Sequence, residues 1–223
     1  MRQAIGEILP FAVIVMVSPI NIVAAILLLF SKRPLLNASC YFAGFLVGVT
    51  AVLTGLILVA GAISLDPGTE RSRGAALLLL VLGVALVIVA IRKFRHRPGP
   101  DDDPSLPAWM DGIAGFGPGR SLAVGAGIGA GNPKNVAVAF GAAVAISTSQ
   151  LPGAQQAVVV AVYVVLASLG VGAPIVAVLA LGDRSTEVLE SWRAWLNRHS
   201  AAMLAVIYLL LGVLLIGKNL GTV

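Results

Sequence analysis

The sequence predicts an all-α integral membrane protein with six transmembrane helices, built as two inverted three-helix repeats in which helices 1 and 4 are broken. Composition is the first reason, because hydrophobic residues make up 58% of the 223 residues and charged residues only 11%, with a mean hydropathy of +0.98. A soluble domain carries roughly a quarter charged residues, so this chain cannot cover its surface for water. The other reasons are six apolar stretches and a break motif that occurs twice.

The six apolar stretches are the predicted spans. Each approaches or exceeds the roughly 18 apolar residues that cross a bilayer, and connections rich in Pro, Gly or charge separate them. We expect the spans at Ile5–Phe30, Asn37–Ser64, Gly74–Ile91, Arg120–Ser149, Gln156–Leu181 and Ala201–Asn219.

One connection is longer than the others and divides the chain. Residues 92–119 are predicted to link a first three-helix repeat at residues 1–91 to a second at residues 120–223. The linker begins with the basic run RKFRHR and the acidic Asp101–Asp103, and it ends in PSLPAWMDGIAGFGPG. The apolar and aromatic residues of its second half favour an interfacial helix at the level of the lipid headgroups.

Basic residues set the predicted orientation. The loops between spans 1 and 2, 3 and 4, and 5 and 6 hold ten Lys or Arg residues, and the opposite side holds four. An excess of basic residues marks the cytoplasmic side of a membrane. We therefore expect the linker in the cytoplasm and both termini outside.

A short motif occurs in both halves. Span 1 contains SPINIVA at residues 18–24, and span 4 contains NPKNVAV at residues 132–138. Both read as a capping residue, Pro, any residue, Asn, and then small or β-branched residues. The copies lie three spans apart, and this odd number predicts opposite orientations across the membrane. Paired interruptions in two halves of a membrane protein point to the binding site of a transporter.

The prolines predict a helix break in each span. Pro19 and Pro133 each remove a backbone donor, so the helix must kink or open there. The preceding residues, Ser18 and Asn132, are favoured N-caps, and proline is favoured at the first helical position. We therefore predict two half-helices that start at the motifs. Their partly positive N-termini would meet near the bilayer midplane.

Three polar side chains accompany these breaks. Asn21 and Asn135 follow the prolines by two residues and are predicted to line the same cavity. Lys134 adds a full charge at membrane depth, which marks an interior functional site; the alternative is that it snorkels to an interface. Every acidic residue lies in a loop or at the start of the chain, so the lysine has no obvious counter-ion. We predict a site for an anionic group such as phosphate, sulfate or carboxylate.

Glycines predict close helix packing. Gly44 and Gly48 have the GxxxG spacing of tight helix contacts. The run Gly125, Gly127, Gly129 and Gly131 leads up to the second break. For this run we expect either the same packing or a flexible, unwound segment beside the site.

Other classes of function have little support in the sequence. It contains no nucleophile–base pair, phosphate-cradling loop or cluster of metal ligands, so we expect no enzyme, metal or cofactor. The single Cys40 excludes an internal disulfide. The net charge of +5 comes from basic residues in short loops, where they set topology, so we expect no nucleic-acid partner.

Long stretches also resemble a known family. They are SPINIVAAILLLFSKRPLLNASCYFAGFLVG, PAWMDGIAGFGPGRSLAVGAGIGAGNPKNVAVAFGAAVAIS and AVIYLLLGVLLIGKNL, and they resemble the GAP family, the Sap-like peptidoglycolipid addressing proteins of the lysine exporter (LysE) superfamily. The resemblance implies a six-helix transporter of envelope lipids in the bacterial inner membrane, with Pro19 and residues 132–135 in the functional motifs. This superfamily often has a second proline where the chain has Asn21, which leaves the geometry of the first break open.

Three functions remain open at this point. The first is a transporter of an anionic or glycosylated envelope lipid, with the headgroup at the breaks and the tails in the bilayer. An exporter of amino acids or other small carboxylates is the alternative, and the shape of the cavity separates the two. An apolar lateral opening beside Lys134 favours the lipid, and a sealed aqueous cavity favours the metabolite. The third is an accessory scaffold of a larger envelope-lipid export machinery. A homodimer is expected only by analogy with small transporters.

Overall fold

The chain folds into helices over the residues that its computed structural model describes, which are 1–62, 70–95, 110 and 112–219. No strand occurs within these ranges, so the predicted all-α class is confirmed for them. The helices are α1 (Arg2–Met16), α2 (Pro19–Leu29), α3 (Pro34–Ala62), α4 (Glu70–Arg95), η2 (Ile113–Gly115), α5 (Pro118–Gly131), α6 (Pro133–Thr148), α7 (Gly153–Leu181), η3 (Gly182–Arg184) and α8 (Ser185–Asn219).

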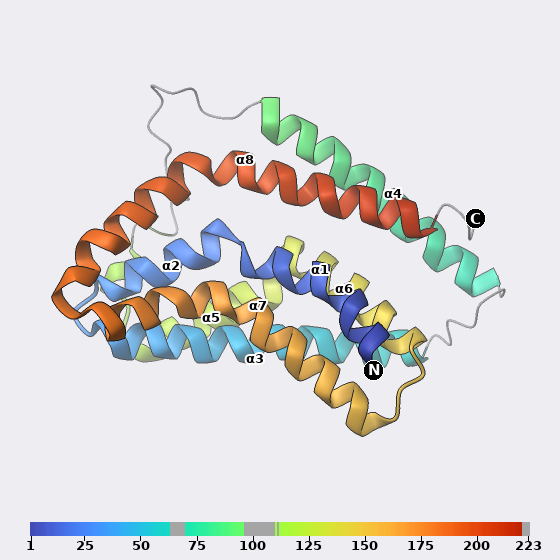
Figure 1. Cartoon of the computed structure of the whole chain (residues 1–223), viewed down its shortest axis with the longest axis horizontal. Coiled ribbons are helices and arrows are strands. Elements are labelled where there is room, and N and C mark those ends of the chain that lie inside the picture. Colours follow the sequence, from blue (N-terminus) through green and yellow to red (C-terminus); the bar gives the residue numbers. More distant parts are fainter. Residues whose placement is uncertain (63–69, 96–109, 111, 220–223) are drawn as a thin grey trace.

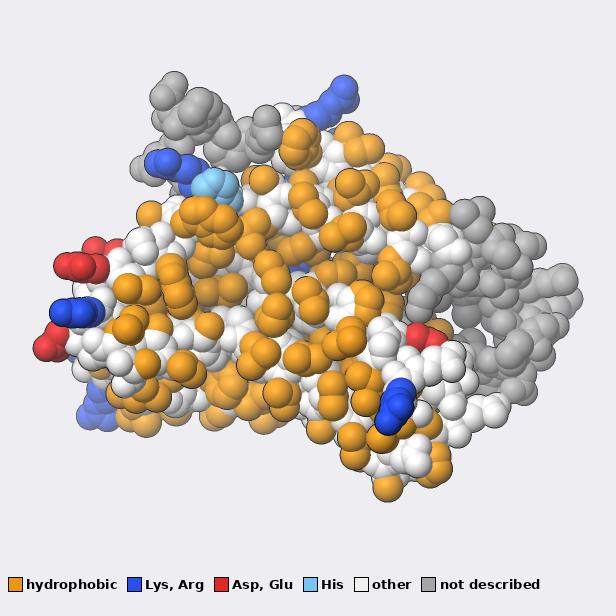
Figure 2. All heavy atoms as spheres, in the orientation of Figure 1, with side chains coloured by type: hydrophobic (Ala, Val, Ile, Leu, Met, Phe, Trp, Pro, Cys, Tyr) orange, Lys and Arg blue, Asp and Glu red, His pale blue; other side chains and the backbone are white. Residues whose placement is uncertain are grey.

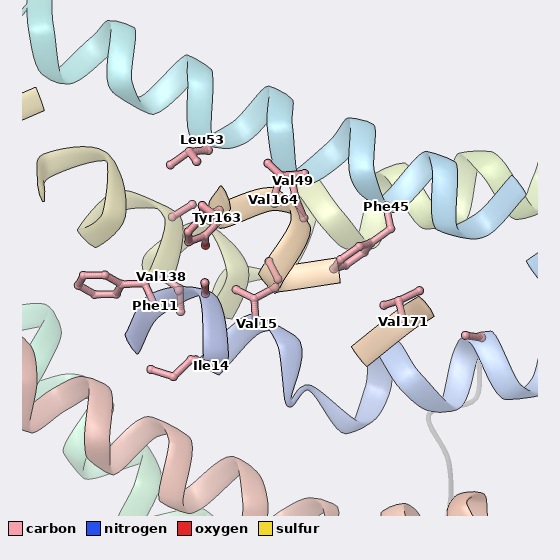
Figure 3. Packing of buried hydrophobic residues seen from close by; sticks show 14 of the residues in the cluster. Phe11, Ile14, Val15, Phe45, Val49, Leu53, Val138, Tyr163, Val164 and Val171 are labelled. Atoms are coloured by element: carbon pink, nitrogen blue, oxygen red, sulfur yellow. The ribbon is translucent and has the colours of Figure 1, made fainter. Parts of the chain in front are cut away.

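The helices form one bundle around a core of aliphatic and aromatic side chains. Helices α4 and α8 lie side by side along one edge, and α3 lies across the bundle from them against α5 and α6 (Figure 1). Helix α1 packs between these layers against α6 and α7. Figure 3 shows the centre of this core, where Phe11 and Val15 of α1 lie near Val138 of α6 and Tyr163 of α7.

Glycines bring α3 and α5 into backbone contact. A Cβ on Gly44 would overlap the carbonyl of Leu122, and a Cβ on Gly125 would overlap the carbonyl of Tyr41. Gly48 and Gly129 repeat the pattern one turn later along each helix, in the same direction, so the two helices run parallel. Small residues at such positions let backbones approach closely. The predicted tight contact at Gly44 and Gly48 is confirmed.

The glycine run before the second break is helical. Helix α5 continues to Gly131, so the alternative of an unwound segment is wrong. The physical reason is the spacing, because Gly125 and Gly129 lie one turn apart and both face α3. A Cβ on Gly127 or Gly131 would meet nothing within 4 Å, so these two glycines face away from the contact.

Part of the described chain consists of helices that are long enough to cross a membrane. Two helical stretches are long and apolar enough to cross a bilayer, Pro34–Ala60 and the 65-residue stretch Gly153–Gly217. The second stretch contains α7 and α8 as far as Gly217. The bent pair of α1 and α2 would be a third crossing if it acts as one broken span. These findings support a membrane protein.

Two predicted connections, the one before the sixth span and the long linker, can be compared with the structure. The polar stretch before the sixth span was expected to be a connection between spans, and it is helical, because α8 is continuous from Ser185 to Asn219. The stretch TEVLESWRAWLNRHS contains charge but no Gly or Pro, and its Glu, Leu, Ala and Arg are good helix formers. Of the predicted linker, residues 96–109 and 111 lie outside the described residues, and the described Met110 and Ile113 are buried in the core.

Substitution of one contact glycine tests the α3–α5 packing. Gly48→Leu places a side chain against the backbone of α5 and is expected to destabilise the protein by at least about 2 kcal/mol, which corresponds to roughly 4–8 °C in Tm for a protein of this size. The measurement is thermal unfolding of the purified protein in detergent. Gly127→Leu is the control, because its position is open and the change in helix propensity is the same. Equal losses for both variants would contradict the contact.

Candidate functional site

The first break separates α1 from α2. Helix α1 ends at Met16, α2 begins at Pro19, and the two helices differ in direction by 50°. Ser18 is extended at the predicted N-cap position, but its side chain makes no capping hydrogen bond. The prediction of a side-chain cap is therefore wrong. The backbone alone forms this start, with the Ser18 carbonyl accepting from the Ile22 amide at 3.2 Å.

The second break separates α5 from α6 and is capped by a side chain. Asn132 is extended between Gly131 and Pro133, and its Oδ1 accepts from the backbone N–H of Lys134 at 3.0 Å. The predicted N-cap is confirmed. Asn135 then reaches back across the break, where its Nδ2 donates to the carbonyl of Ile128 at 3.1 Å. Carbonyls in the last turn of a helix have no helical donor, so Asn135 closes the end of α5.

Lys134 joins the second break to the first. Its side chain is only 4% exposed, and its Nζ donates to the carbonyl of Ile14 at 3.2 Å. Ile14 lies in the last turn of α1, where the helix carries partial negative charge. The lysine therefore points into the bundle, which excludes the snorkelling alternative in this structure. Its partner is the C-terminal end of α1 and not a counter-ion, which the sequence did not indicate.

Asparagine side chains near the breaks keep unused hydrogen-bonding capacity. Asn21 is 1% exposed, and neither its Nδ2 nor its Oδ1 has a partner, while its backbone carbonyl accepts from the Tyr41 hydroxyl at 3.2 Å. The Oδ1 of Asn135 is also buried without a partner. A buried unsatisfied group costs about 1–3 kcal/mol, so such groups in a native structure require an explanation. A polar ligand at the breaks would explain the unpaired groups of both side chains.

The structure adds two residues that the sequence analysis did not select. Tyr163 of α7 is fully buried, its hydroxyl has no partner, and Figure 3 places it beside Val138 and Val15. Gly170 of α7 lies against the first break, because a Cβ there would overlap the carbonyl of Met16. A lone tyrosine within an apolar span was the available signal for Tyr163. The sequence held no signal for Gly170, because its role depends on its contact with the end of α1.

An apolar groove runs beside the first break. It has a volume of about 420 Å³ and lies between α1 and α8. Val13, Ile14 and Val17 line one side, and the other side includes Trp195, Met203 and Leu210. Figure 2 shows that the surface over these helices is mostly hydrophobic, with Lys and Arg side chains mainly toward its edges. The groove is thus an apolar surface next to the carbonyl that binds Lys134.

The fold and the two breaks define a class of protein. The chain is a helical, membrane-type protein in which two broken helices meet at one buried lysine. A family model described as Sap, sulfolipid-1-addressing protein (SfLAP), matches residues 8–221, and the chain belongs to this family. The predicted Sap-like membership is thereby confirmed. No curated protein and no solved structure matches the chain.

The two N-cap positions give a matched pair of variants. Asn132→Ala removes the hydrogen bond to the Lys134 amide and is expected to cost about 1 kcal/mol of stability. Ser18→Ala removes no capping bond and should cost clearly less. Thermal or denaturant unfolding in detergent measures the difference between the two variants. A loss at Ser18 equal to that at Asn132 would contradict the described asymmetry of the breaks.

Proposed function

We propose that the chain is a transporter of an anionic or glycosylated envelope lipid, with the headgroup bound at the two breaks. The substrate-binding residues would be Ser18, Pro19, Asn21, Asn132, Pro133, Lys134 and Asn135. The observation that carries the proposal is the buried ammonium of Lys134 bound to the carbonyl of Ile14 at the other break. The description of the family supports the class of substrate, since a sulfolipid carries an anionic sulfate on a lipid.

In the proposed binding step, the Lys134 ammonium exchanges the carbonyl of Ile14 for the anionic headgroup. An ammonium has three N–H donors, and the carbonyl of Ile14 accepts one of them. The hydrogen bond to the Ile14 carbonyl is already charge-assisted, but a sulfate, phosphate or carboxylate also brings a full negative charge, which attracts a buried ammonium more strongly than a neutral carbonyl does. An anionic headgroup would therefore replace the Ile14 carbonyl and release the link between α1 and α6. The unpartnered amide of Asn21 would supply donors and acceptors for a sugar.

The groove between α1 and α8 supports a lipid over a small metabolite. Its lining is almost wholly apolar, and it passes Ile14 and Val17 on either side of the end of α1. An acyl tail could lie there while the headgroup reaches the breaks. A small carboxylate would gain little from such a surface. An exporter of amino acids or other carboxylates remains the alternative, because its ligand would meet the same lysine.

The directions of the helices support a six-span arrangement. Six spans that alternate in direction require α3 to run parallel to α5 and α4 antiparallel to α8, as the glycine contacts place them. They also require α1 to oppose α6, which agrees with Phe11 lying on Gly141 and Ile14 on Lys134. We therefore retain two inverted repeats, an inner-membrane location with both termini outside, and residues 92–119 in the cytoplasm as parts of the proposal.

Substitution of Lys134 tests the site in cells. Lys134→Met keeps the length of the side chain but removes its charge. One hydrogen bond to a charged group is worth about 1.5–3 kcal/mol, so export should fall by roughly ten- to a hundredfold. The measurement is lipidomics of cell-surface extracts from cells with the wild-type chain, without it, and with the variant. Lys32→Met is the control, since Lys32 is exposed near the end of α2.

The outcomes separate the competing functions. If no surface lipid changes when the chain is absent, the lipid proposal is wrong, and efflux of small carboxylates becomes the next measurement. A scaffold of a larger export machinery predicts a different pattern, in which Lys134→Met exports normally and deletion within residues 96–109 abolishes export. Vesicles that contain only the purified chain and a fluorescent sulfated glycolipid then test whether the chain moves the lipid unaided, as monomer or homodimer.

A further inference from the structure

A second groove lies between α8 and α4, and Val206 of α8 lines both this groove and the one between α1 and α8. The two helices come closest at their glycines, where a Cβ on Gly212 would lie 2.6 Å from the carbonyl of Gly83. From there they run antiparallel toward the C-terminal end of α4, and a groove of about 370 Å³ lies between them. It is lined by Ala90, Ile91, Phe94, Arg95, Ala205, Val206 and Leu209.

The shape of this groove follows from the sizes of its residues. Ala90 and Ala205 form the floor and are 3% and 4% exposed. The larger side chains of Ile91 and Phe94 on α4, and of Val206 and Leu209 on α8, are exposed and form the walls. Two small residues opposite each other thus leave an apolar channel along the helix pair. A channel of this kind fits an extended hydrocarbon chain, which needs no hydrogen-bond partner.

The polar end of the groove is basic. Among the described residues that line the groove, Arg95 alone is charged, and it is the last residue of α4. Arg92 and Lys93 lie in the same last turn. A guanidinium matches phosphate with two parallel hydrogen bonds, and basic residues at the end of a membrane helix attract anionic lipids. The groove therefore offers an apolar channel and a cationic end in one place.

We propose that this groove binds an anionic membrane phospholipid, with one acyl chain between α4 and α8 and the phosphate at Arg95. Complementary charge favours this occupant over a neutral lipid, which would leave the arginine unused. A lone hydrocarbon or a peptide would not use the apolar channel and the cation together. The groove is lined by none of the residues proposed to bind the headgroup at the breaks, although Val206 also lines the groove between α1 and α8. The proposed site depends on membrane insertion and not on the identity of the transported lipid.

Native mass spectrometry of the purified full chain tests this site. The protein is mixed with phosphatidylglycerol or phosphatidylcholine that carry identical acyl chains, and the ratio of retained lipid is measured. The wild type should retain phosphatidylglycerol preferentially. Arg95→Gln should lower the ratio by about fivefold, the factor that corresponds to about 1 kcal/mol per basic residue near the surface. Ala205→Leu fills the floor and should reduce retention of both lipids.

A matched control separates the site from general attraction of charge. Arg33→Gln makes the same change at an exposed position between α2 and α3 and should leave the ratio unchanged. The proposal is overturned if the wild type shows no preference, or if Arg33→Gln and Arg95→Gln lower the ratio equally. Unfolding in detergent checks that each variant is folded. Transport by Arg95→Gln is expected to continue, so failure here would not affect the function proposed for the breaks.

Discussion

The hydrogen bond from Lys134 to the carbonyl of Ile14 is the constraint around which the centre of this bundle is built. In the proposed six-span arrangement Lys134 lies at the middle of a membrane helix, where a lysine costs about 2.5–3.5 kcal/mol on insertion scales. One hydrogen bond to a charged group contributes about 1.5–3 kcal/mol, so this carbonyl offsets much of that cost. The carbonyl is available because α1 ends two residues later. The broken helix and the buried charge therefore depend on each other.

Close packing around α1 keeps the two groups in reach. A Cβ on Gly170 of α7 would overlap the carbonyl of Met16, and a Cβ on Gly141 of α6 would lie 2.5 Å from the ring of Phe11. Gly170 lets α7 approach the end of α1, and Gly141 lets α6 approach the same helix at Phe11. Protein interiors are packed without large voids, so any displacement of α1 must move these neighbours. A headgroup that takes the place of Ile14 would thus act on three helices at once.

Local chemistry explains which parts of the fold could be predicted from the sequence. Pro19 and Pro133 specify the two breaks because a proline cannot continue the hydrogen-bond ladder. Asn132 caps the N-terminus of α6, as its side chain allows. The burial of Lys134 followed from an apolar span without acids. Its partner could not be predicted, since a backbone carbonyl has no sequence signature. Ser18 has the same capping chemistry as Asn132, yet tertiary packing leaves its side chain without that bond.

The errors have a similar origin. The helical form of the connection before the sixth span was not predicted, because charge was taken as a separator between spans, although nothing in that stretch breaks a helix. The run of glycines before Asn132 is compatible with close helix packing and with an unwound segment. Packing is observed because α3 lies beside it. Tyr163 and Gly170 acquire their positions from helices that are distant in the sequence. In each case the sequence did not indicate which helix packs against the residues concerned.

The central claim concerns the partner of Lys134 when a lipid is bound. An experimental structure of the chain with a sulfated glycolipid in a membrane disc tests it most directly. We expect the sulfate within hydrogen-bonding distance of the Lys134 Nζ, with the Ile14 carbonyl displaced and the acyl tails toward the groove between α1 and α8. A structure in which the lipid is bound elsewhere, while the Lys134–Ile14 hydrogen bond remains, would contradict it.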